Sequence, residues 1–218
     1  GKTWQGPYEI PTFGTKGIAA RTDYLVDGPR EMTIFLTAAK DNDGQQGRTL
    51  CVRTKDGGRT WAVVGHVGPE PPVGKKAIMP SSVRLSDTTI LTAVRRKRSI
   101  DLYRTEDNGE TWAYVGKPAP DTGANNGNPP SLIRLKDGRF VLVHGYRSPP
   151  YGIRARISED EGQTWSEEIM LRDDGGGRDL GYVRTVQRPD GKLVSVYYYN
   201  DGPEDERYIA ATIWDPGK

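Results

Sequence analysis

The sequence predicts an all-β fold, a β-propeller built from four-stranded antiparallel blades. The first observation is an octapeptide of the form Ser/Thr-x-Asp-x-Gly-x-Thr-Trp, which occurs at Thr54–Trp61, Thr105–Trp112 and Ser158–Trp165. The second is its spacing, because the closing tryptophans are 51 residues apart (112 − 61) and then 53 residues apart (165 − 112). A regular period in this range, with room for four short strands per repeat, is typical of propeller blades.

The octapeptide has the chemistry of a stapled hairpin turn. Its Asp and Ser/Thr side chains hydrogen-bond to backbone groups of their own turn, and its glycine supplies a position with positive φ. The Thr-Trp pair then opens the next strand, where the indole packs against a neighbouring sheet. Each copy therefore predicts the connection between the third and fourth strands of one blade.

Composition limits the other possibilities. The chain has 218 residues, which suits one all-β domain, and its 27 glycines and 16 prolines suit many tight turns. The net charge of +2 gives no compositional indication of nucleic-acid binding. Cys51 is the single cysteine, in an apolar strand, and is expected to be a buried, inert thiol. No apolar run approaches the ~18 residues of a membrane span.

Strands are expected where short runs of β-branched and aromatic residues lie between Gly, Pro and Asp turns. The first two blades have expected strands at 19–26, 31–38, 48–54 and 60–67, and at 78–85, 89–95, 100–105 and 111–116. The third blade has them at 131–135, 139–144, 153–158 and 164–171. The fourth has three, at 182–188, 192–199 and 207–214. The single domain 1–218 thus divides into blades at about 17–69, 76–118, 128–171 and 179–215.

The missing fourth strand can come from residues 3–10, with a strand at 5–10. Asp215–Lys218 and Gly1–Trp4 together approximate one more octapeptide, so the N-terminal strand is expected to complete the last blade. The chain shows no signal peptide or initiator Met, and it looks like a piece of a longer precursor cut at a repeat boundary. Three possibilities stay open: a closed four-bladed ring, a ring that lacks about two blades, and a homo-oligomer that completes the ring.

The two ends of each blade differ. Short polar turns lie on the octapeptide side, whereas the connections on the other side are longer, as at 68–76, 117–128 and 171–180. Longer loops are where functional residues concentrate. The side opposite the octapeptides is therefore the expected working face.

The octapeptide resembles the Asp-box, and the chain resembles the sialidase-like (neuraminidase superfamily) Asp-box or BNR-repeat propellers. That resemblance implies an exo-glycosidase, in a family that usually has six blades and is secreted or periplasmic. It would hydrolyse terminal acidic, sialic-acid-like sugars by a retaining mechanism with a tyrosine nucleophile and no cofactor or metal. Tyr182 matches the position of that tyrosine, at the start of a late inner strand.

The resemblance also implies arginines that hold the substrate carboxylate through bidentate pairs. Arg154 matches one of them, with Arg147 in a Pro-rich loop as its rival, and Arg184 follows Tyr182 on the same strand. Arg95 or Arg96 matches a second, and Arg21 a third.

The carboxylates of the family pattern are less evident. Where the family has a glutamate that activates the tyrosine, this chain has Met79, which is no base. Asp43 is the candidate catalytic aspartate, with Asp41 on the same loop and Asp23 on the inner strand as alternatives. Besides hydrolysis of an acidic glycan, two hypotheses remain: a carbohydrate-binding or scaffold propeller without catalysis, and a truncated or engineered blade array. No nucleic-acid partner is expected.

Overall fold

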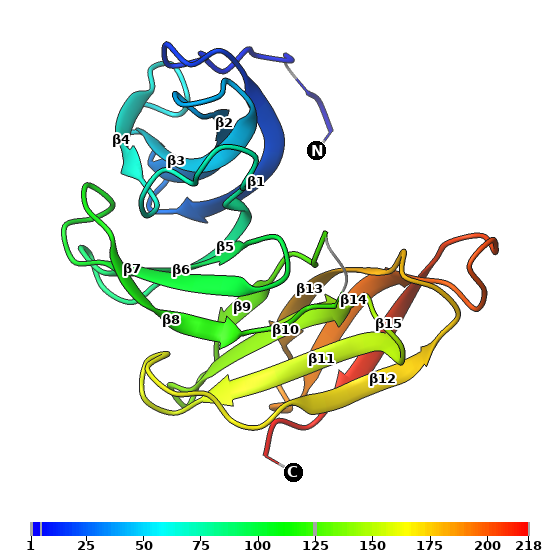
Figure 1. The fold of residues 1–218 in the computed structure, drawn as a ribbon. Helices are drawn as coiled ribbons and strands as arrows, with labels where there is room; N and C mark the ends of the chain where they lie inside the picture. Colours follow the sequence, from blue (N-terminus) through cyan, green and yellow to red (C-terminus); the bar gives the residue numbers. More distant parts are fainter. Residues whose placement is uncertain (1, 5, 124–125, 218) are drawn as a thin grey trace.

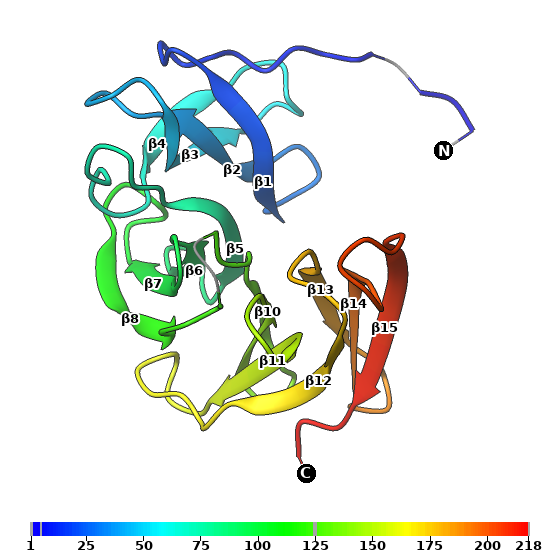
Figure 2. The same cartoon turned by 45° about the vertical axis from the view of Figure 1, so that its right-hand side comes forward.

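The computed structural model describes residues 2–4, 6–123 and 126–217, and within these ranges it has fifteen strands in four antiparallel sheets. The sheets follow one another around an arc from the N-terminus to the C-terminus, as the blades of a four-bladed propeller (Figures 1 and 2). The predicted all-β propeller is confirmed. No helix in the described part of the chain is long and apolar enough to span a membrane.

The first three blades each contain four strands, in chain order within the sheet. Blade 1 has β1 (Ile18–Val26), β2 (Met32–Ala39), β3 (Gln46–Thr54) and β4 (Ala62–His66). Blade 2 has β5 (Ile78–Arg84), β6 (Ile90–Arg95), β7 (Ile100–Thr105) and β8 (Ala113–Ala119). Blade 3 has β9 (Ser131–Arg134), β10 (Phe140–Tyr146), β11 (Tyr151–Ser158) and β12 (Ile169–Gly175). Blade 4 has β13 (Gly181–Gln187), β14 (Leu193–Tyr199) and β15 (Tyr208–Trp214).

The three octapeptides form the same hydrogen-bonded turn. In the third copy Asp160 accepts hydrogen bonds from the Thr164 backbone N–H (2.8 Å) and hydroxyl, and the Trp165 indole donates to the Gly162 carbonyl (3.0 Å). Gly162 has φ +88°, and a Cβ there would lie 2.7 Å from the Leu102 side chain in blade 2, so this position requires glycine. The turn therefore fixes the start of the outer strand and also fits closely against the preceding blade.

Hydrophobic cores lie between consecutive blades. Phe35 of blade 1 packs with Ile90 of blade 2, and Trp112 covers both. Phe140 of blade 3 likewise packs with Leu102 of blade 2. Cys51 is buried in the first of these cores, and burial raises the pKa of its thiol to about 12, so it is inert as expected.

Hydrogen bonds between innermost strands connect each blade to the next, and we call them inner-strand latches. A side-chain oxygen on one innermost strand accepts from a backbone N–H of the next innermost strand. The three latches are Ser82 N to Asp23 Oδ2 (2.5 Å), Leu132 N to Ser81 Oγ (2.9 Å) and Thr185 N to Ser131 Oγ (3.0 Å). In blade 4 the corresponding position is Arg184, which has no acceptor atom.

The predicted closure by the N-terminus is wrong for the described residues. Residues 2–4 and 6–17 contain no strand, and the sheet of blade 4 ends at β15. Instead Phe13 packs against the far side of blade 1. The free face of blade 4 exposes apolar side chains, namely Val186, Val196, Ile209 and Ile213.

The outer strand of blade 3, predicted at 164–171, begins later than predicted, at Ile169, because Ser166 still hydrogen-bonds to Ile157 within the turn.

The latches predict a stability effect that is specific to the hydroxyl group. Ser131→Ala leaves the Thr185 N–H without its acceptor in a buried position, so we expect a loss of about 1–3 kcal/mol in the free energy of unfolding. Ser99→Ala is the control, because the Ser99 hydroxyl has no hydrogen-bond partner in the described part of the chain. Urea unfolding followed by tryptophan fluorescence measures both, and equal stabilities for the two variants would contradict the latch.

Candidate functional site

The innermost strands of blades 2 and 4 both have a non-glycine residue in the left-handed region at their second position. Met79 and Tyr182 each have φ +53°, at irregular steps in the pairing of β5 with β6 and of β13 with β14. Such a conformation is costly for a residue with a side chain and persists where surrounding contacts hold it. The Tyr182 side chain remains 44% exposed, at the mouth between the blades.

Asn128 holds the backbone that carries Tyr182. This fully buried residue lies in the connection from blade 2 to blade 3; its Oδ1 accepts from Tyr182 N (3.0 Å) and its Nδ2 donates to Leu180 O (2.8 Å). Gly181, between those two residues, has φ +109°, and a Cβ there would lie 2.4 Å from Asn128. Tyr182 is thus positioned by a residue from another blade that sequence patterns alone did not single out.

Arg95 lies beside the Tyr182 hydroxyl. Its Nη1 is 3.4 Å from Tyr182 Oη and 2.9 Å from the Met79 sulfur, and its Nε donates to Asn126 O (2.9 Å). Burial lowers the pKa of Arg95 from its usual value, and the nearby charges of Arg147 and Arg21 act in the same direction. Arg95 has no carboxylate partner within the described ranges.

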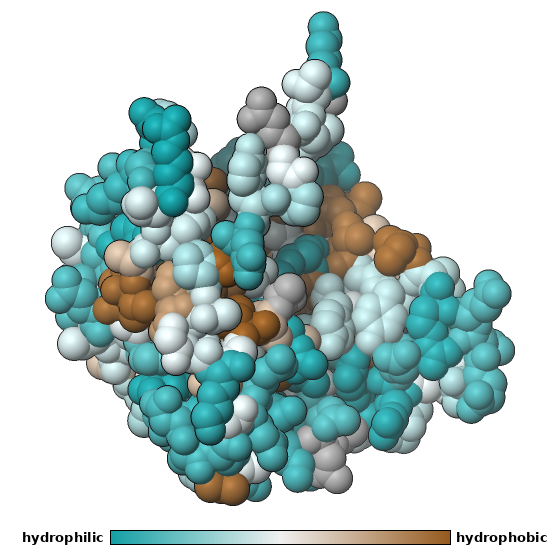
Figure 3. Space-filling view, turned by 90° about the horizontal axis from the view of Figure 1, so that it is seen from above, coloured by the Kyte–Doolittle hydropathy of each residue, from teal (hydrophilic) through white to brown (hydrophobic). Residues whose placement is uncertain are grey.

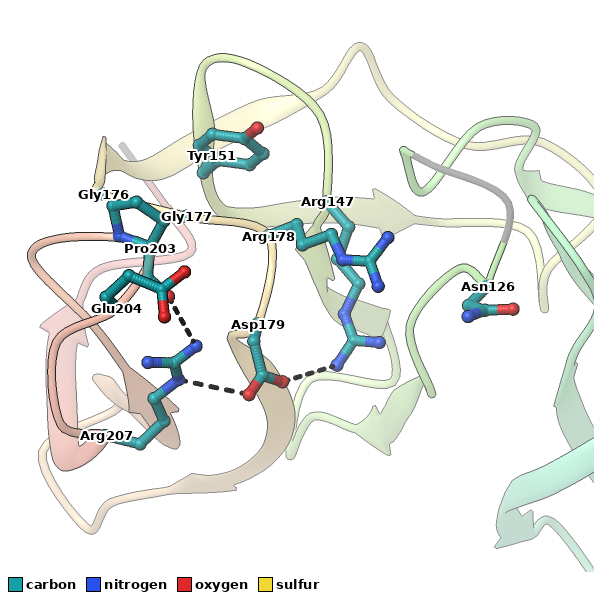
Figure 4. A pocket seen from close by; sticks show the side chains of 10 residues that line it. All are labelled: Asn126, Arg147, Tyr151, Gly176, Gly177, Arg178, Asp179, Pro203, Glu204 and Arg207. Carbon is teal, nitrogen blue, oxygen red and sulfur yellow. Dashed lines mark hydrogen bonds and ion pairs between the residues drawn. The ribbon is translucent and has the colours of Figure 1, made fainter.

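Arg147 reaches Tyr182 from the opposite side. Its guanidinium lies 5.6 Å from the centre of the Tyr182 ring, and its Nη2 donates to Tyr198 Oη (2.7 Å). Tyr198 in turn donates to Asp179 (2.7 Å), and this hydrogen bond is the largest factor that lowers the pKa of Asp179. Figure 4 shows Asp179 between Arg147 and Arg207, with which it forms ion pairs at 3.8 Å and 3.1 Å.

Three cavities adjoin at this mouth. The first, of about 320 Å³, is lined by Arg21, Thr22, Met79, Pro80, Pro129, Tyr182, Val183 and Arg184. The second, also about 320 Å³, is lined by Arg21, Gly74, Lys75, Lys76, Ile78, Arg95, Arg96, Lys97, Asn126 and Tyr182. The third, of about 620 Å³, contains Arg147 and Asp179 (Figure 4). No Asp or Glu of the described residues lines the first two.

The structure brings together most of the predicted site residues. Tyr182, Arg21, Arg95 and Arg184 line the first two cavities, and Arg147 lies on the other side of Tyr182. Arg96 lines the second cavity and pairs with Asp101 (3.3 Å). The predicted working face is therefore where these side chains meet, and the choice between Arg95 and Arg96 favours Arg95, which contacts Tyr182.

Arg154 and Asp43 lie elsewhere. Arg154 is 2% exposed; it donates to the Pro150 carbonyl (2.9 Å) and pairs with Glu168 (3.2 Å), so it is a structural residue of blade 3. Asp43 pairs with the buried Lys40 (2.6 Å), and the hydrogen bond from Lys40 lowers its pKa to about 2. Neither residue lines the three cavities, so of Arg154 and its rival Arg147 it is Arg147 that lies beside Tyr182.

Asp23 is the carboxylate nearest to this arrangement on the inner strands. It follows Arg21 on β1 by two residues and accepts the latch hydrogen bond from Ser82 N (2.5 Å). Burial raises the pKa of Asp23, and the Ser82 hydrogen bond and the Arg184 charge oppose that shift. This shift agrees with the perturbed pKa expected for a carboxylate near the propeller axis.

The face of the molecule seen from above in Figure 3 is largely hydrophilic, with hydrophobic side chains gathered in a few patches. In the linings of the first two cavities, all of the charged groups are Arg and Lys. The arrangement is suited to hold an anion against a tyrosine side chain.

Comparison with known proteins supports a repeat propeller. The model of the BNR repeat-like domain matches residues 1–195. No curated protein matches the chain. Among solved structures, a protein of unknown function from Dyadobacter fermentans has a TM-score of 0.78 and 26% identity, covering 98% of this chain and 61% of that chain.

Two enzymes share the fold at lower identity. The GH93 alpha-L-arabinofuranosidase of Fusarium graminearum, solved with arabinobiose, has a TM-score of 0.64 and 19% identity, covering 91% of this chain and 63% of that chain. The Trypanosoma rangeli sialidase, solved with the inhibitor DANA, has a TM-score of 0.57 and 14% identity, covering 89% of this chain and 30% of that chain. This chain therefore spans less than two thirds of each of these proteins.

The pKa of Asp23 predicts a dependence of stability on pH. Since its folded-state pKa is raised above the usual 3.8, ionisation at neutral pH opposes folding. Asp23→Asn keeps an oxygen that accepts from Ser82 N and removes the charge, so it should be more stable than wild type at pH 7. This advantage should disappear below about pH 3.8, where both side chains are neutral.

Asp23→Ala is the control, because it loses both the charge and the acceptor and should be less stable than Asp23→Asn at every pH. Urea unfolding between pH 3 and pH 8 measures all three proteins. A wild type that is more stable than Asp23→Asn at pH 7 would show that the Asp23 charge is net stabilising.

Proposed function

The chain belongs to the BNR repeat-like domain family and has a glycoside-hydrolase-like propeller fold, and from this we propose that its mouth recognises the carboxylate of an acidic sugar. The observation that carries the proposal is the convergence of Arg21, Arg95 and Arg147, from blades 1, 2 and 3, around Tyr182 of blade 4. The activity of a longer protein that contains this chain belongs to the same proposal.

The electrostatics favour an anionic ligand. Arg95 is only 9% exposed and its guanidinium is satisfied by a carbonyl, a sulfur and a phenol, none of which carries a full negative charge. A buried cation without a counter-charge is unfavourable, and a ligand carboxylate would supply that charge. Guanidinium groups bind carboxylates in a planar bidentate geometry, which favours a carboxylate over a neutral hydroxyl group.

The aromatic groups favour a sugar as the body of the ligand. Tyr182 and Tyr198 are neighbours, with ring centres 5.6 Å apart, and both contact Arg147. An aromatic face beside polar donors offers apolar contact to a sugar ring and hydrogen bonds to its hydroxyls. The related folds include proteins solved with arabinobiose and with DANA, which is consistent with a carbohydrate ligand.

Hydrolysis is the second candidate, because Tyr182 is exposed, conformationally strained and adjacent to a guanidinium that would stabilise its phenolate. In that reaction Tyr182 Oη bonds to the anomeric carbon and gives its proton to solvent water, while the bond from the anomeric carbon to the leaving oxygen breaks and that oxygen takes a proton from a general acid. Water then cleaves the glycosyl–tyrosine bond with retention. Asp23 replaces Asp43 as the proposed acid, since its raised pKa helps it to hold a proton.

Recognition has more support than hydrolysis. Met79, where the sialidase resemblance implies a glutamate, contacts Arg95 and provides no base. The hydrogen-bond partner of the Tyr182 hydroxyl in the described part of the chain is Arg95, not a carboxylate.

Binding of simple sugars tests recognition. Calorimetry with methyl glycosides of sialic acid, glucuronic acid and galactose should detect the two acidic sugars and not the neutral one. Arg95→Leu should weaken acidic-sugar binding about 10-fold or more, because a charge-assisted hydrogen bond is worth about 1.5–3 kcal/mol. Arg188→Leu, at the opposite end of blade 4, is the control and should bind like wild type. Equal affinity for the galactoside would refute carboxylate recognition.

Turnover tests hydrolysis separately. A panel of fluorogenic sialosides and uronides should show release of the fluorophore by wild type, at least 1,000-fold slower release by Tyr182→Phe, and no change in Tyr114→Phe. Tyr114 is an exposed tyrosine on β8 and serves as the matched control. Acidic-sugar binding by Tyr182→Phe should stay within about threefold of wild type, and turnover that survives in this variant would exclude Tyr182 as the nucleophile.

A further inference from the structure

We propose that the second cavity takes a second anionic group of the same ligand, so the ligand class is a polyanionic oligosaccharide with acid groups on successive sugars. This inference rests on the proposed recognition of an acidic sugar at Tyr182. It extends that function from a single terminal acid to a glycan chain that occupies two adjoining cavities.

The lining of the second cavity is strongly cationic. Six of its ten residues carry a positive charge, namely Arg21, Lys75, Lys76, Arg95, Arg96 and Lys97, and none of the ten carries a negative charge. The whole chain has a net charge of only +2, so this is a local concentration of positive charge. Such a concentration raises the local density of anions and favours their binding.

These cations are mostly without counter-charges. In the part of the chain that the structure describes, Arg96 pairs with Asp101, whereas no carboxylate pairs with the side chains of Arg21, Arg95, Lys75, Lys76 or Lys97. Isolated surface lysines are ordinarily solvated and carry no function. These three exposed lysines differ from isolated surface lysines because they line one cavity together with the buried Arg95 and with Tyr182.

The loop that carries Lys75 and Lys76 is held in place by the buried ion pair between Lys40 and Asp43. Lys40 Nζ donates to Asp43 (2.6 Å) and to Pro72 O (2.9 Å), and Asp43 also accepts from Gly74 N (3.1 Å). The loop then closes with Lys75 N donating to Pro72 O (2.9 Å). Asp43, predicted as a catalytic residue, thus positions the lysines beside the cavity.

The opposite side of the cavity is also ordered. Lys97 lies in the tight turn between β6 and β7, which is closed by Arg96 N donating to Ser99 O (2.8 Å). Because hydrogen bonds hold both cationic segments in place, the second anion site is partly preorganised, which reduces the entropic cost of binding.

The shared lining residues connect the two cavities. Arg21 and Tyr182 line both cavities and Arg95 lines the second, so a ligand whose first carboxylate lies among Arg21, Arg95 and Arg147 has its next acid group beside the lysines of the second cavity. A cavity of about 320 Å³ is at the lower end of the size range for small-ligand sites and suits roughly one further sugar unit. Lysine ammonium groups bind carboxylate and sulfate alike, because they act as mobile point charges.

The experiment compares ligands that differ only in the number of acid groups. Calorimetry with mono-, di- and trigalacturonate should show affinity that rises at least 10-fold from monomer to trimer, and a gain that shrinks as salt screens the charges. In Lys75→Gln/Lys76→Gln/Lys97→Gln this gain should fall below threefold, while monogalacturonate binding stays within twofold of wild type. A sulfated chondroitin disaccharide, run beside digalacturonate, distinguishes sulfate from carboxylate as the preferred second group.

The matched control is Lys55→Gln/Lys136→Gln/Lys192→Gln, which removes three positive charges from exposed turns at the octapeptide end of the blades and should keep the full gain. Equal affinity for monomer and trimer, or an unchanged gain in the cavity variant, would overturn the inference. A single-stranded oligonucleotide of equal charge that binds as tightly as trigalacturonate would overturn the assignment to a glycan.

The two proposals fail in different ways. A wild-type protein that binds no monogalacturonate or other monoacidic sugar contradicts recognition at Tyr182. A protein that binds the monoacid through Arg95 but gains nothing from further acid groups contradicts only the second site.

Discussion

The inner-strand latch is the interaction on which the arrangement of the blades depends. Backbone hydrogen bonds hold each sheet together, but they stop at the sheet edge, and the latches from Asp23, Ser81 and Ser131 are what join innermost strands to one another. They set the spacing of β1, β5, β9 and β13 and hence the width of the mouth. At the corresponding position in blade 4, Arg184 has a positive charge and no acceptor atom. That charge lowers the pKa of Asp23 in blade 1, against the larger effect of burial. Within the described residues, no latch therefore joins the first and last blades.

The spacing of the innermost strands also brings the side chains of the candidate site together. Met79 and Tyr182 lie at the second position of their strands, in the left-handed region immediately before the latch segments, so both side chains reach the mouth. The two side chains differ in whether they can exchange a proton. Arg95 contacts the sulfur of Met79 and the hydroxyl of Tyr182, so the guanidinium lies between a residue that cannot titrate and one that can. Asn128 fixes the second of these by a buried side-chain contact to its backbone, and strain at Tyr182 is maintained by that contact.

The distance along the chain between interacting residues explains how much of the structure the sequence could predict. The octapeptide turns depend on residues within eight positions of each other, so the period and the strands were predictable, as was the side on which the longer loops lie. Tyr182, Arg21 and Arg95 followed from a resemblance. By contrast, Asn128 acts on Tyr182 from 54 residues away, and Lys75 joins the site only through the fold. The sequence position of Arg154 does not show that its guanidinium donates to carbonyls of its own blade, and that of Phe13 does not show that it packs against blade 1.

The two ends of the blades differ in how their charged side chains are paired. At the octapeptide end the carboxylates are occupied by their own turns. Hydrogen bonds within the turn lower the pKa of Asp107 to about 2 and shift that of Asp160 in the same direction. Their capacity to accept is used inside the turn, and little is left for a ligand. At the other end some loop carboxylates pair with basic side chains, as Asp43 does with Lys40, but no described carboxylate pairs with Lys75, Lys76 or Lys97 around Arg95. A chain of nearly balanced charge therefore has a local concentration of unpaired cations beside Tyr182, which supports the proposed binding of an anionic glycan there.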